Sequence, residues 1–505
     1  MTFADSLESR SHEAGASSRH PRIVQGGMGT GVSSWFLANV VARHGQLGVV
    51  SGTVIDGIVA RRLQDGDPGG HMRRALASFP FPDVAARVVR RYYVPDGIGE
   101  GVPYRRIPTW SLHADPALVE LTVCANYAEV WLAREGHSGL VGINYLEKIQ
   151  TPHLASLYGA MLAGVDYVIM GAGIPVQIPG VLNQLAQGLP ASMRVHVEQS
   201  EPSDDFRVTF DPCAITGGRR LDIRRPFFVP IISSATLGEM LISKSSGVVD
   251  GFVVEGPTAG GHNAPPRGKM VLNDKGEPVY GPRDRMDFDR MRSLGLPFWV
   301  AGSYGSPEKL KEALELGAVG VQVGTAFALC SESGLDEGLR QRLIELALED
   351  RFEVLTDPLA SASGFPFKVA QIEGTLSDRE VYESRERVCD MGYLRRPYKK
   401  PDGSIGYRCF AEPLASYLAK GGMIEDTVGR KCLCNALLAN IGLGQVRKDG
   451  SRELPLVTLG DDASFVKRIL TGGRTSYSAV EVIAYLLGQS VDEVRAVGEA
   501  SIRQG

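Results

Sequence analysis

The sequence predicts an α/β protein, and within that class a (β/α)8 barrel, the TIM-barrel fold. Short, continuously apolar segments alternate with stretches that have the pattern of amphipathic helices. Such alternation is typical of parallel strands that are covered by helices on both faces. The number of apolar segments favours a closed barrel over a six-stranded doubly wound sheet. The predicted strands are residues 22–26, 47–52, 139–145, 166–173, 227–234, 251–256, 297–303 and 320–327.

The segments between the predicted strands account for the rest of this region. Residues 151–164 and 306–318 have helical patterns, and the second opens with a Ser-Pro pair, which is typical of a helix cap and first turn. Residues 53–138 are too long for a single crossover, so we expect an insertion with its own helices after the second strand. Residues 194–212 are predicted to form a polar hairpin or lid.

Three regions are expected along the 505 residues. Residues 1–20 are predicted to be a disordered tail, and residues 21–360 the barrel with its insertion. After about residue 360 the alternation of strands and helices stops, so residues 361–505 are expected to form a mixed C-terminal extension packed on the barrel. A last helical pattern covers residues 478–502. The length suits one large domain with an appendage.

The composition excludes several classes of function. The formal net charge is −4 and no basic run occurs, so we expect no nucleic-acid partner. No stretch approaches the ~18 apolar residues of a membrane span, and no signal peptide precedes the barrel. Seven cysteines, an odd number, indicate reduced thiols. We therefore expect a soluble cytoplasmic protein without a membrane partner.

Glycines and polar residues gather where the predicted strands end, which is the face that carries the active site of such a barrel. The first strand runs into Gly27, Met28 and Gly29, the third into Asn144 and the fourth into Gly171. A glycine turn lets the backbone approach a flat aromatic ring closely, and Asn144 can bond the ring's polar edge. The alternative is that Asn144 only forms a turn. No ribose-binding acid follows at the spacing of a dinucleotide site.

The last two predicted strands run into a pair of short glycine-containing loops. Gly302 and Ser303 lie at the end of the seventh strand, and Gly324 and Thr325 lie at the end of the eighth. Backbone N–H groups and hydroxyls in these loops suit a phosphate monoester, and this is the usual phosphate site of a barrel. The alternative is that the glycines only turn the chain.

One histidine follows the sixth predicted strand, in the stretch "GFVVEGPTAGGH". His262 comes directly after Gly260 and Gly261, so we expect it at the mouth of the barrel. There it can act as a general base or acid, or donate a hydrogen bond to a small anionic substrate. The alternative is a packed or solvent-facing histidine without a catalytic role.

The extension holds a group of cysteines at residues 389, 409, 432 and 434. Four thiols in one region can hold zinc or an iron–sulfur cluster. However, Cys-x-Cys is not the usual Cys-x2-Cys spacing of such sites, and free cysteine is common in protein interiors. We therefore assign no metal ligands from the sequence.

With these residues in view, the chain resembles the nitronate monooxygenase (2-nitropropane dioxygenase-like) family of FMN-dependent TIM-barrel oxidoreductases. This family is related to flavin-dependent enoyl reductases of polyketide and polyunsaturated fatty-acid synthases. The resemblance covers about residues 21–335. It rests on "IVQGGMGTG", "LGVVSG", "GINYLEK", "VEGPTAGGH", "PFWVAGSYGS" and "VQVGTAF", which occur in the family's order.

The resemblance implies a site for FMN and a catalytic histidine. His262 would be the base in the oxidation of a nitronate or nitroalkane, and oxygen would reoxidise the flavin. The ring would lie against the turn after the first strand and the phosphate on the last two loops. The cofactor-binding residues assigned in this way are Gly27, Met28, Gly29, Asn144, Gly171, Gly260, Gly261, Gly302, Ser303, Gly324 and Thr325.

Two departures from the family pattern leave the substrate open. Pro257 and Thr258 stand where typical members have an acid-alanine type of pair, and residues 361–369 are similar to the synthase-associated reductases. The first alternative is therefore a trans-acting enoyl-thioester (enoyl-ACP) reductase that takes electrons from NAD(P)H. The second is a non-enzymatic flavin scaffold whose extension recruits a partner. The substrate would be a small molecule or a carrier-bound acyl group, and a homodimer remains open.

Overall fold

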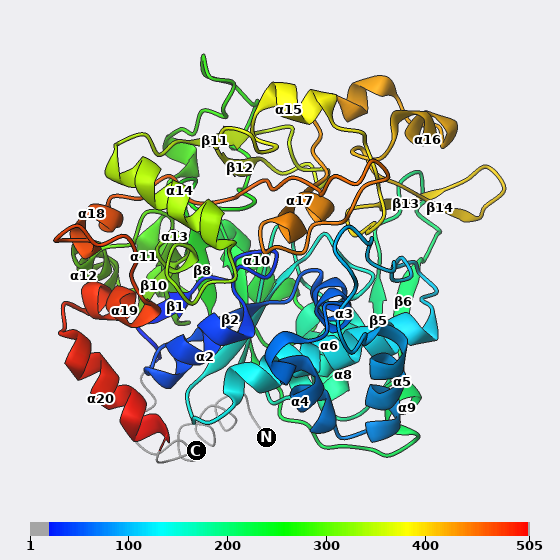
Figure 1. Ribbon diagram of the computed structural model, residues 1–505, viewed down its shortest axis with the longest axis horizontal. Coiled ribbons are helices and arrows are strands. Elements are labelled where there is room, and N and C mark those ends of the chain that lie inside the picture. Colours follow the sequence, from blue (N-terminus) through cyan, green and yellow to red (C-terminus); the bar gives the residue numbers. More distant parts are fainter. Residues whose placement is uncertain (1–19, 503–505) are drawn as a thin grey trace.

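A parallel sheet forms the centre of the fold in the computed structural model, which describes residues 20–502 (Figure 1). Residues 1–19 of the predicted tail lie outside the described residues. The strands of the sheet, in chain order, are β1 (Ile23–Gln25), β2 (Gly48–Ser51), β3 (Val141–Leu146), β4 (Tyr167–Gly171), β7 (Phe227–Ile232), β8 (Phe252–Glu255), β9 (Phe298–Ala301) and β10 (Gly320–Val323).

The sheet closes into a barrel. Its order is β1-β10-β9-β8-β7-β4-β3-β2, and every neighbouring pair is parallel. The two ends meet because Val24 in β1 forms a parallel bridge with Leu47, the residue before β2. The backbone N–H of Leu47 donates to Ile23 at 3.1 Å, and that of Gln25 donates to Leu47 at 3.0 Å. The predicted eight-stranded barrel is confirmed.

Each predicted strand overlaps an observed one, but the last was extended too far. β10 ends at Val323, and a short helix, α13 (Thr325–Ala328), begins directly after Gly324. The prediction of a strand through residue 327 is therefore wrong. The apolar residues after Gly324 continue the hydrophobic run but pack as one helical turn, and Ala326 and Phe327 are fully buried there.

Helices cover the outside of the barrel. One of them, α12 (Pro307–Glu315), begins as predicted, because the Ser306 side chain accepts a hydrogen bond from the N–H of Lys309 at 3.2 Å. The remaining α-helices before residue 350 are α2 (Trp35–Arg43), α3 (Ile55–Gln64), α4 (His71–Ala77), α5 (Pro82–Tyr92), α6 (Pro116–Arg134), α7 (His153–Leu162), α8 (Ile178–Ala186), α9 (Cys213–Thr216), α10 (Ala235–Lys244), α11 (Phe288–Ser293) and α14 (Glu337–Leu348). Two 3-10 turns, η1 (Pro68–Gly70) and η2 (Pro282–Asp284), complete them.

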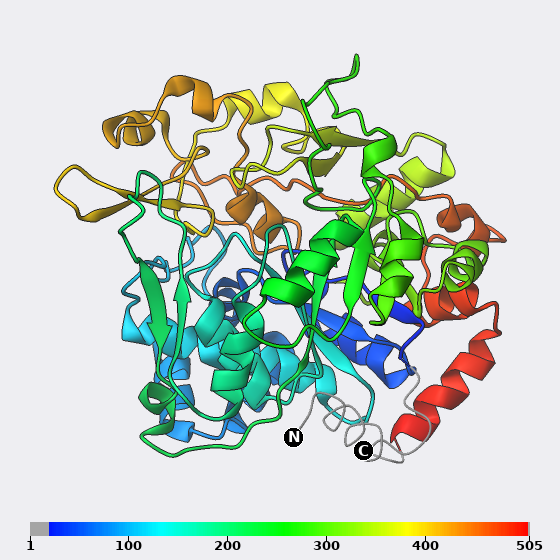
Figure 2. The ribbon, with the colours of Figure 1, turned by 180° about the vertical axis from the view of Figure 1, so that it is seen from behind.

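The polar segment that follows α8 forms a hairpin. β5 (Ala191–Arg194) pairs antiparallel with β6 (Arg207–Phe210), close to the range that the sequence predicts. Its connecting loop reaches another hairpin, formed by β13 (Arg396–Lys399) and β14 (Ile405–Arg408). The two hairpins stand side by side in both views (Figures 1 and 2). The N–H of Glu198 donates to Pro397 at 2.9 Å where they meet.

The chain after α14 crosses the carboxyl-terminal end of the barrel and then descends along its side (Figure 1). The predicted start of the extension, residue 361, falls in the loop between β11 (Val354–Asp357) and β12 (Phe367–Ala370). Residues 478–502 form two helices instead of one, because Gly488 adopts a left-handed conformation (φ 63°) that ends the first. The elements are β11 (Val354–Asp357), β12 (Phe367–Ala370), α15 (Arg379–Ser384), α16 (Leu414–Ala419), η3 (Ile424–Thr427), α17 (Leu433–Ala439), α18 (Phe465–Ile469), α19 (Ala479–Leu487) and α20 (Val491–Ile502).

The interior of the barrel is a packed core. Side chains from β1, β2, β4, β7, β8 and β9 meet there. Trp299 is only 1% exposed, and its indole N–H donates to the carbonyl of Pro21 at 2.8 Å. A filled barrel leaves space for a ligand only above the strands. Among the described residues, no helix is both long and apolar enough to cross a membrane.

A buried carboxylate joins the insertion to the extension. Asp56, on α3, accepts hydrogen bonds from the indole of Trp110 at 3.1 Å and the hydroxyl of Thr122 at 3.0 Å. It also accepts the hydroxyl of Tyr393, which belongs to the extension. Because Asp56 is only 2% exposed, each of these donors depends on it for a partner.

Replacing this carboxylate should destabilise the whole fold. Asp56→Ala leaves buried donors without an acceptor, so we expect the free energy of unfolding to fall by about 3 kcal/mol. Urea unfolding followed by fluorescence measures the change. The exposed Asp96→Ala is the control and should stay within about 0.5 kcal/mol of wild type. Equal stabilities for the two variants would contradict the linking role of Asp56.

Candidate active site

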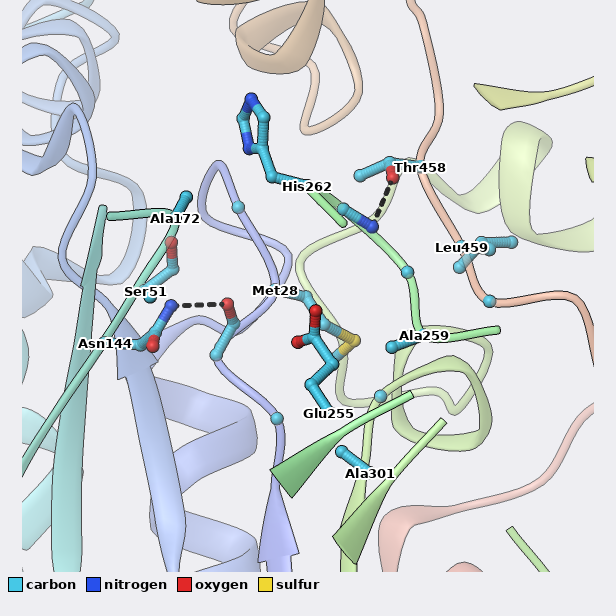
Figure 3. A pocket seen from close by; sticks show the side chains of 18 of the residues that line it. Met28, Ser51, Asn144, Ala172, Glu255, Ala259, His262, Ala301, Thr458 and Leu459 are labelled. Atoms are coloured by element: carbon cyan, nitrogen blue, oxygen red, sulfur yellow. Dashed lines mark hydrogen bonds between the residues drawn. The ribbon is translucent and has the colours of Figure 1, made fainter. Parts of the chain in front are cut away.

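A cavity of about 240 Å³ opens at the carboxyl ends of the barrel strands (Figure 3). Loops from around the barrel and residues of the extension line it together. Every residue that the sequence analysis assigned to the cofactor or to catalysis is among them. These residues are Gly27, Met28, Gly29, Asn144, Gly171, Gly260, Gly261, His262, Gly302, Ser303, Gly324 and Thr325.

Two fully buried polar side chains, Ser33 and Gln25, form hydrogen bonds that support the turn after β1. The Ser33 hydroxyl donates to the carbonyl of Gly26 at 2.7 Å and accepts the N–H of Met28 at 2.8 Å. Gln25 donates to the Ser33 hydroxyl at 2.6 Å and accepts the N–H of Val49, on β2, at 2.9 Å. This network fixes the backbone of the turn, so Met28 is presented to the cavity from a rigid support.

Asn144 supports the same turn from β3. Its side-chain amide donates to the carbonyl of Gly27 at 3.2 Å (Figure 3). A Cβ built on Gly27 would lie 2.2 Å from the Cβ of Asn144, so this close approach requires glycine. Asn144 was expected to bond the polar edge of a ring, but in the structure its side-chain amide donates an N–H to the protein backbone.

The loops after β9 and β10 leave an open cradle. Ser303 lies in the left-handed region (φ 57°), directly after Gly302 (φ 95°). A Cβ built on Gly324 would meet only the Cγ and Sδ of Met28, at 3.7 Å, so any side chain there would extend into the cavity. The Thr325 hydroxyl accepts the N–H of Gly460 at 2.9 Å and is therefore held by the extension. The space in front of Gly324 is therefore open to a ligand.

The loop that carries the histidine lies between two segments of the extension. The carbonyl of Gly261 accepts the N–H of Lys368 at 2.9 Å, and its N–H donates to the Thr458 hydroxyl at 2.9 Å (Figure 3). Further along, the N–H of Asp461 donates to the carbonyl of Thr258 at 3.1 Å. The extension therefore forms one wall of the cavity and fixes the course of this loop.

His262 lines the cavity but its ring contacts the extension. Nε2 lies 2.7 Å from the hydroxyl of Ser361, and the ring packs against Phe367 with centroids 4.7 Å apart. Figure 3 shows the ring directed away from Met28 and Glu255. Burial lowers the pKa of His262 to about 4, so the imidazole is neutral at neutral pH. A neutral ring can accept a proton.

Glu255 is a cavity residue that the sequence analysis did not assign. It is the last residue of β8, and Figure 3 shows its carboxyl group beside Met28. Burial raises the pKa of Glu255 to about 8, and a hydrogen bond with Asn263 opposes that rise. The side chain is therefore protonated at neutral pH and can donate a hydrogen bond. An acid at the end of a continuously apolar strand was the signal that could have identified it.

The residues contributed by the extension could not be assigned from the sequence. Their positions depend on a chain that returns to the barrel more than a hundred residues after the loops it covers. They include Tyr393, Leu394, Leu433, Leu437, Leu459 and Phe465. These side chains are apolar or aromatic, although Thr458 and Asp462 line the cavity as well, so the extension adds a largely apolar wall to a mouth that is otherwise rich in glycine.

The fold is a (β/α)8 barrel with a cavity at its strand ends, and sequence comparison relates the middle of the chain to a known family. Residues 180–363 match the family model described as nitronate monooxygenase. A probable nitronate monooxygenase of Bacillus subtilis is 34% identical over 113 residues, 22% of this chain and 30% of the relative. A nitronate monooxygenase of Paraburkholderia phytofirmans is 32% identical over 204 residues, 38% of this chain and 50% of the relative. The resemblance to the nitronate monooxygenase family is confirmed.

The extent of these matches is partial. The chain spans between about a third and a half of the length of these relatives. Among solved structures, FabK from Thermotoga maritima covers 95% of this chain and 96% of its own at 14% identity, with a TM-score of 0.46. At that similarity the structural match bears on neither substrate nor cofactor, and the barrel itself is established by its strand pairing.

Ionisation of Glu255 should make stability depend on pH. Its pKa is about 8 in the folded protein and 4.5 in the unfolded chain, so the folded state holds the proton more tightly. The contribution is present below pH 4.5 and is lost as pH rises through 8. Relative to Glu255→Gln, wild type should lose about 2 kcal/mol between pH 5 and pH 9, after allowance for solvent screening.

Urea unfolding of both proteins across this pH range measures the difference. The exposed Glu100→Gln serves as a control, and its stability should run parallel to wild type at every pH. A constant difference between wild type and Glu255→Gln would show that the carboxyl titrates below this window.

Proposed function

We propose that the protein is an FMN-dependent oxidoreductase of the nitronate monooxygenase type, which oxidises nitronates or nitroalkanes with oxygen. The observation that carries the proposal is the convergence of the expected flavin contacts and His262 on a single cavity at the barrel mouth. The family match over residues 180–363 supports the same activity.

The cavity residues fit FMN at both ends. The turn at Met28 offers a rigid backbone surface for the ring, and the open space at Gly324 would receive the phosphate. When bound, FMN supplies the electron-accepting chemistry of the reaction. The protein contributes binding, orientation and proton transfer.

Two titratable groups divide the proton chemistry between them. When the Nε2–H of His262 donates to Ser361, Nδ1 is the nitrogen that accepts a proton from a neutral nitroalkane. Protonated Glu255 donates a hydrogen bond to the anionic nitro group that results. A substrate anion also favours protonation of His262, which raises the histidine's pKa from its low value in the free protein.

The apolar wall of the extension favours a second candidate function. Leu394, Leu433 and Leu437 of the extension line the cavity. Such a wall suits the acyl chain of an enoyl thioester on a carrier, and NAD(P)H would then be the electron donor. The two candidates differ in the source of electrons, which makes them separable in one experiment.

Anaerobic reduction of the flavin distinguishes the candidates. Purified protein with FMN is mixed without oxygen either with propionate 3-nitronate or with NADPH, and the visible flavin band is followed. We expect bleaching by the nitronate alone. Bleaching by NADPH alone would replace the proposal with the enoyl-thioester reductase. Protein that remains colourless with added FMN would contradict both.

His262 should be needed for turnover but not for the cofactor. His262→Ala removes the proton acceptor, so turnover of neutral nitroalkanes should fall by roughly 10²- to 10⁴-fold. Bound FMN should stay at the wild-type level. The exposed His113→Ala is the matched control and should retain full activity. Steady-state oxygen consumption measures both variants, and unchanged turnover in His262→Ala would remove this histidine from the mechanism.

Gly324 should be needed for the cofactor. Gly324→Asp places a carboxylate in the cradle, where it fills the space and repels a phosphate, so the purified protein should lose most of its flavin. The ratio of flavin to protein absorbance measures the loss. Gly99→Asp, at an exposed glycine without a left-handed conformation, is the control. A yellow Gly324→Asp protein would show that the phosphate lies elsewhere.

A further inference from the structure

A row of hydroxyl groups leads from His262 into the extension. Nε2 of His262 lies 2.7 Å from the hydroxyl oxygen of Ser361, and that oxygen lies 2.8 Å from the hydroxyl oxygen of Ser363. Ser361 is fully buried, whereas Ser363 is partly exposed. Neither serine is among the described residues that line the cavity. The row therefore joins the imidazole to the surface of the extension by a route outside the cavity.

Two backbone N–H groups complete the hydrogen bonding of the serines. The N–H of Ser363 donates to the oxygen of Ser361 at 3.1 Å, and the N–H of Phe365 donates to the oxygen of Ser363 at 3.3 Å. A hydroxyl has one proton and two lone pairs, so each serine keeps one donor and one acceptor position for the row. The hydrogen bonds of the row consequently point either outward from His262 or inward to it.

The loop that carries the serines is fixed through its carbonyl groups. Arg430 donates to the carbonyl of Ser361 at 2.7 Å, and Arg396 donates to the carbonyl of Ala362 at 2.9 Å. These two guanidinium groups hold the backbone in place without using the hydroxyls. The hydroxyl oxygens therefore stay at hydrogen-bond distance from each other while their protons change direction.

We propose that Ser361 and Ser363 form a proton relay between His262 and water, an inference that rests on the acid–base role in the proposed function. When Nδ1 takes a proton from the carbon of a nitroalkane, the electrons of the C–H bond stay on the substrate as its nitronate. The Nε2 proton passes to Ser361, the Ser361 proton to Ser363, and the Ser363 proton to water. The imidazole is then neutral again, and Nε2 accepts a hydrogen bond from Ser361.

The same row resets the histidine when it runs inward. The oxygen that the proposed reaction consumes takes up protons as it is reduced, and Nδ1 of His262 supplies one. As it does so, a proton from water enters at Ser363, passes to Ser361 and arrives at Nε2. In sum, one proton has moved from substrate to water and one from water to the reduced oxygen. The relay spares the proton from returning to the nitronate that has just lost it.

Exchange of the imidazole proton with water tests the relay without turnover. In flavin-free protein with isotope-labelled histidine, NMR follows the Nε2 proton of His262, which is assigned by its absence from His262→Gln. Because the relay is the route to water, exchange in Ser363→Ala should be slower than in wild type by about tenfold or more. Ser363→Thr keeps the hydroxyl and should exchange at close to the wild-type rate, as should Ser384→Ala at an exposed serine. Equal rates in wild type and Ser363→Ala overturn the proposal.

Turnover of two matched substrates tests the relay in the reaction. Nitroethane must lose a proton before it is oxidised, whereas its nitronate has already lost it. Ser361→Ala and Ser363→Ala should therefore lower turnover of nitroethane relative to that of the nitronate by about tenfold, and Ser363→Thr should restore the ratio. An equal fall for both substrates would show a purely structural role and overturn the relay. Wild-type protein that does not oxidise nitroethane would contradict the proposed function, and the exchange rates would still decide whether the relay exists.

Discussion

The candidate active site depends on the docking of the extension against one loop of the barrel. The loop after β8 gives its Gly261 carbonyl to Lys368 and its N–H to Thr458, two residues ninety positions apart in the chain. Lys368 also forms an ion pair with Asp461 at 2.7 Å, and its side chain is only 3% exposed. A buried ammonium without this partner would be strongly unfavourable, so the two segments of the extension that carry Lys368 and Asp461 must dock together. The cavity wall and the position of His262 follow from that joint docking.

The barrel could be predicted from the sequence because its signals are local. Each strand is a short apolar run, and each functional loop begins where a run meets glycine, so Gly302 and Gly324 were found without knowledge of the fold. The helix that starts at Thr325 was missed because its apolar residues continue the pattern of β10. Ser361, which bonds His262, and Leu394, which lines the cavity, were not recognisable from the sequence, since only the return of the extension brings them to the barrel.

The chemistry proposed for the cavity relies on two groups that are both neutral at neutral pH. Desolvation removes the charge from Glu255 by raising its pKa and from His262 by lowering its pKa. One group then donates a proton or hydrogen bond and the other accepts, which is the division of labour that acid–base catalysis requires.

The most direct measurement of this account is hydrogen–deuterium exchange on flavin-free protein with and without added FMN. The proposed position of the cofactor is between the barrel loops and the extension. It therefore predicts slower exchange on FMN addition in residues 258–262 and, at the same FMN concentration, in residues 366–370 and 457–461 of the extension. Slower exchange confined to the barrel loops, with the extension segments unaffected, would contradict it.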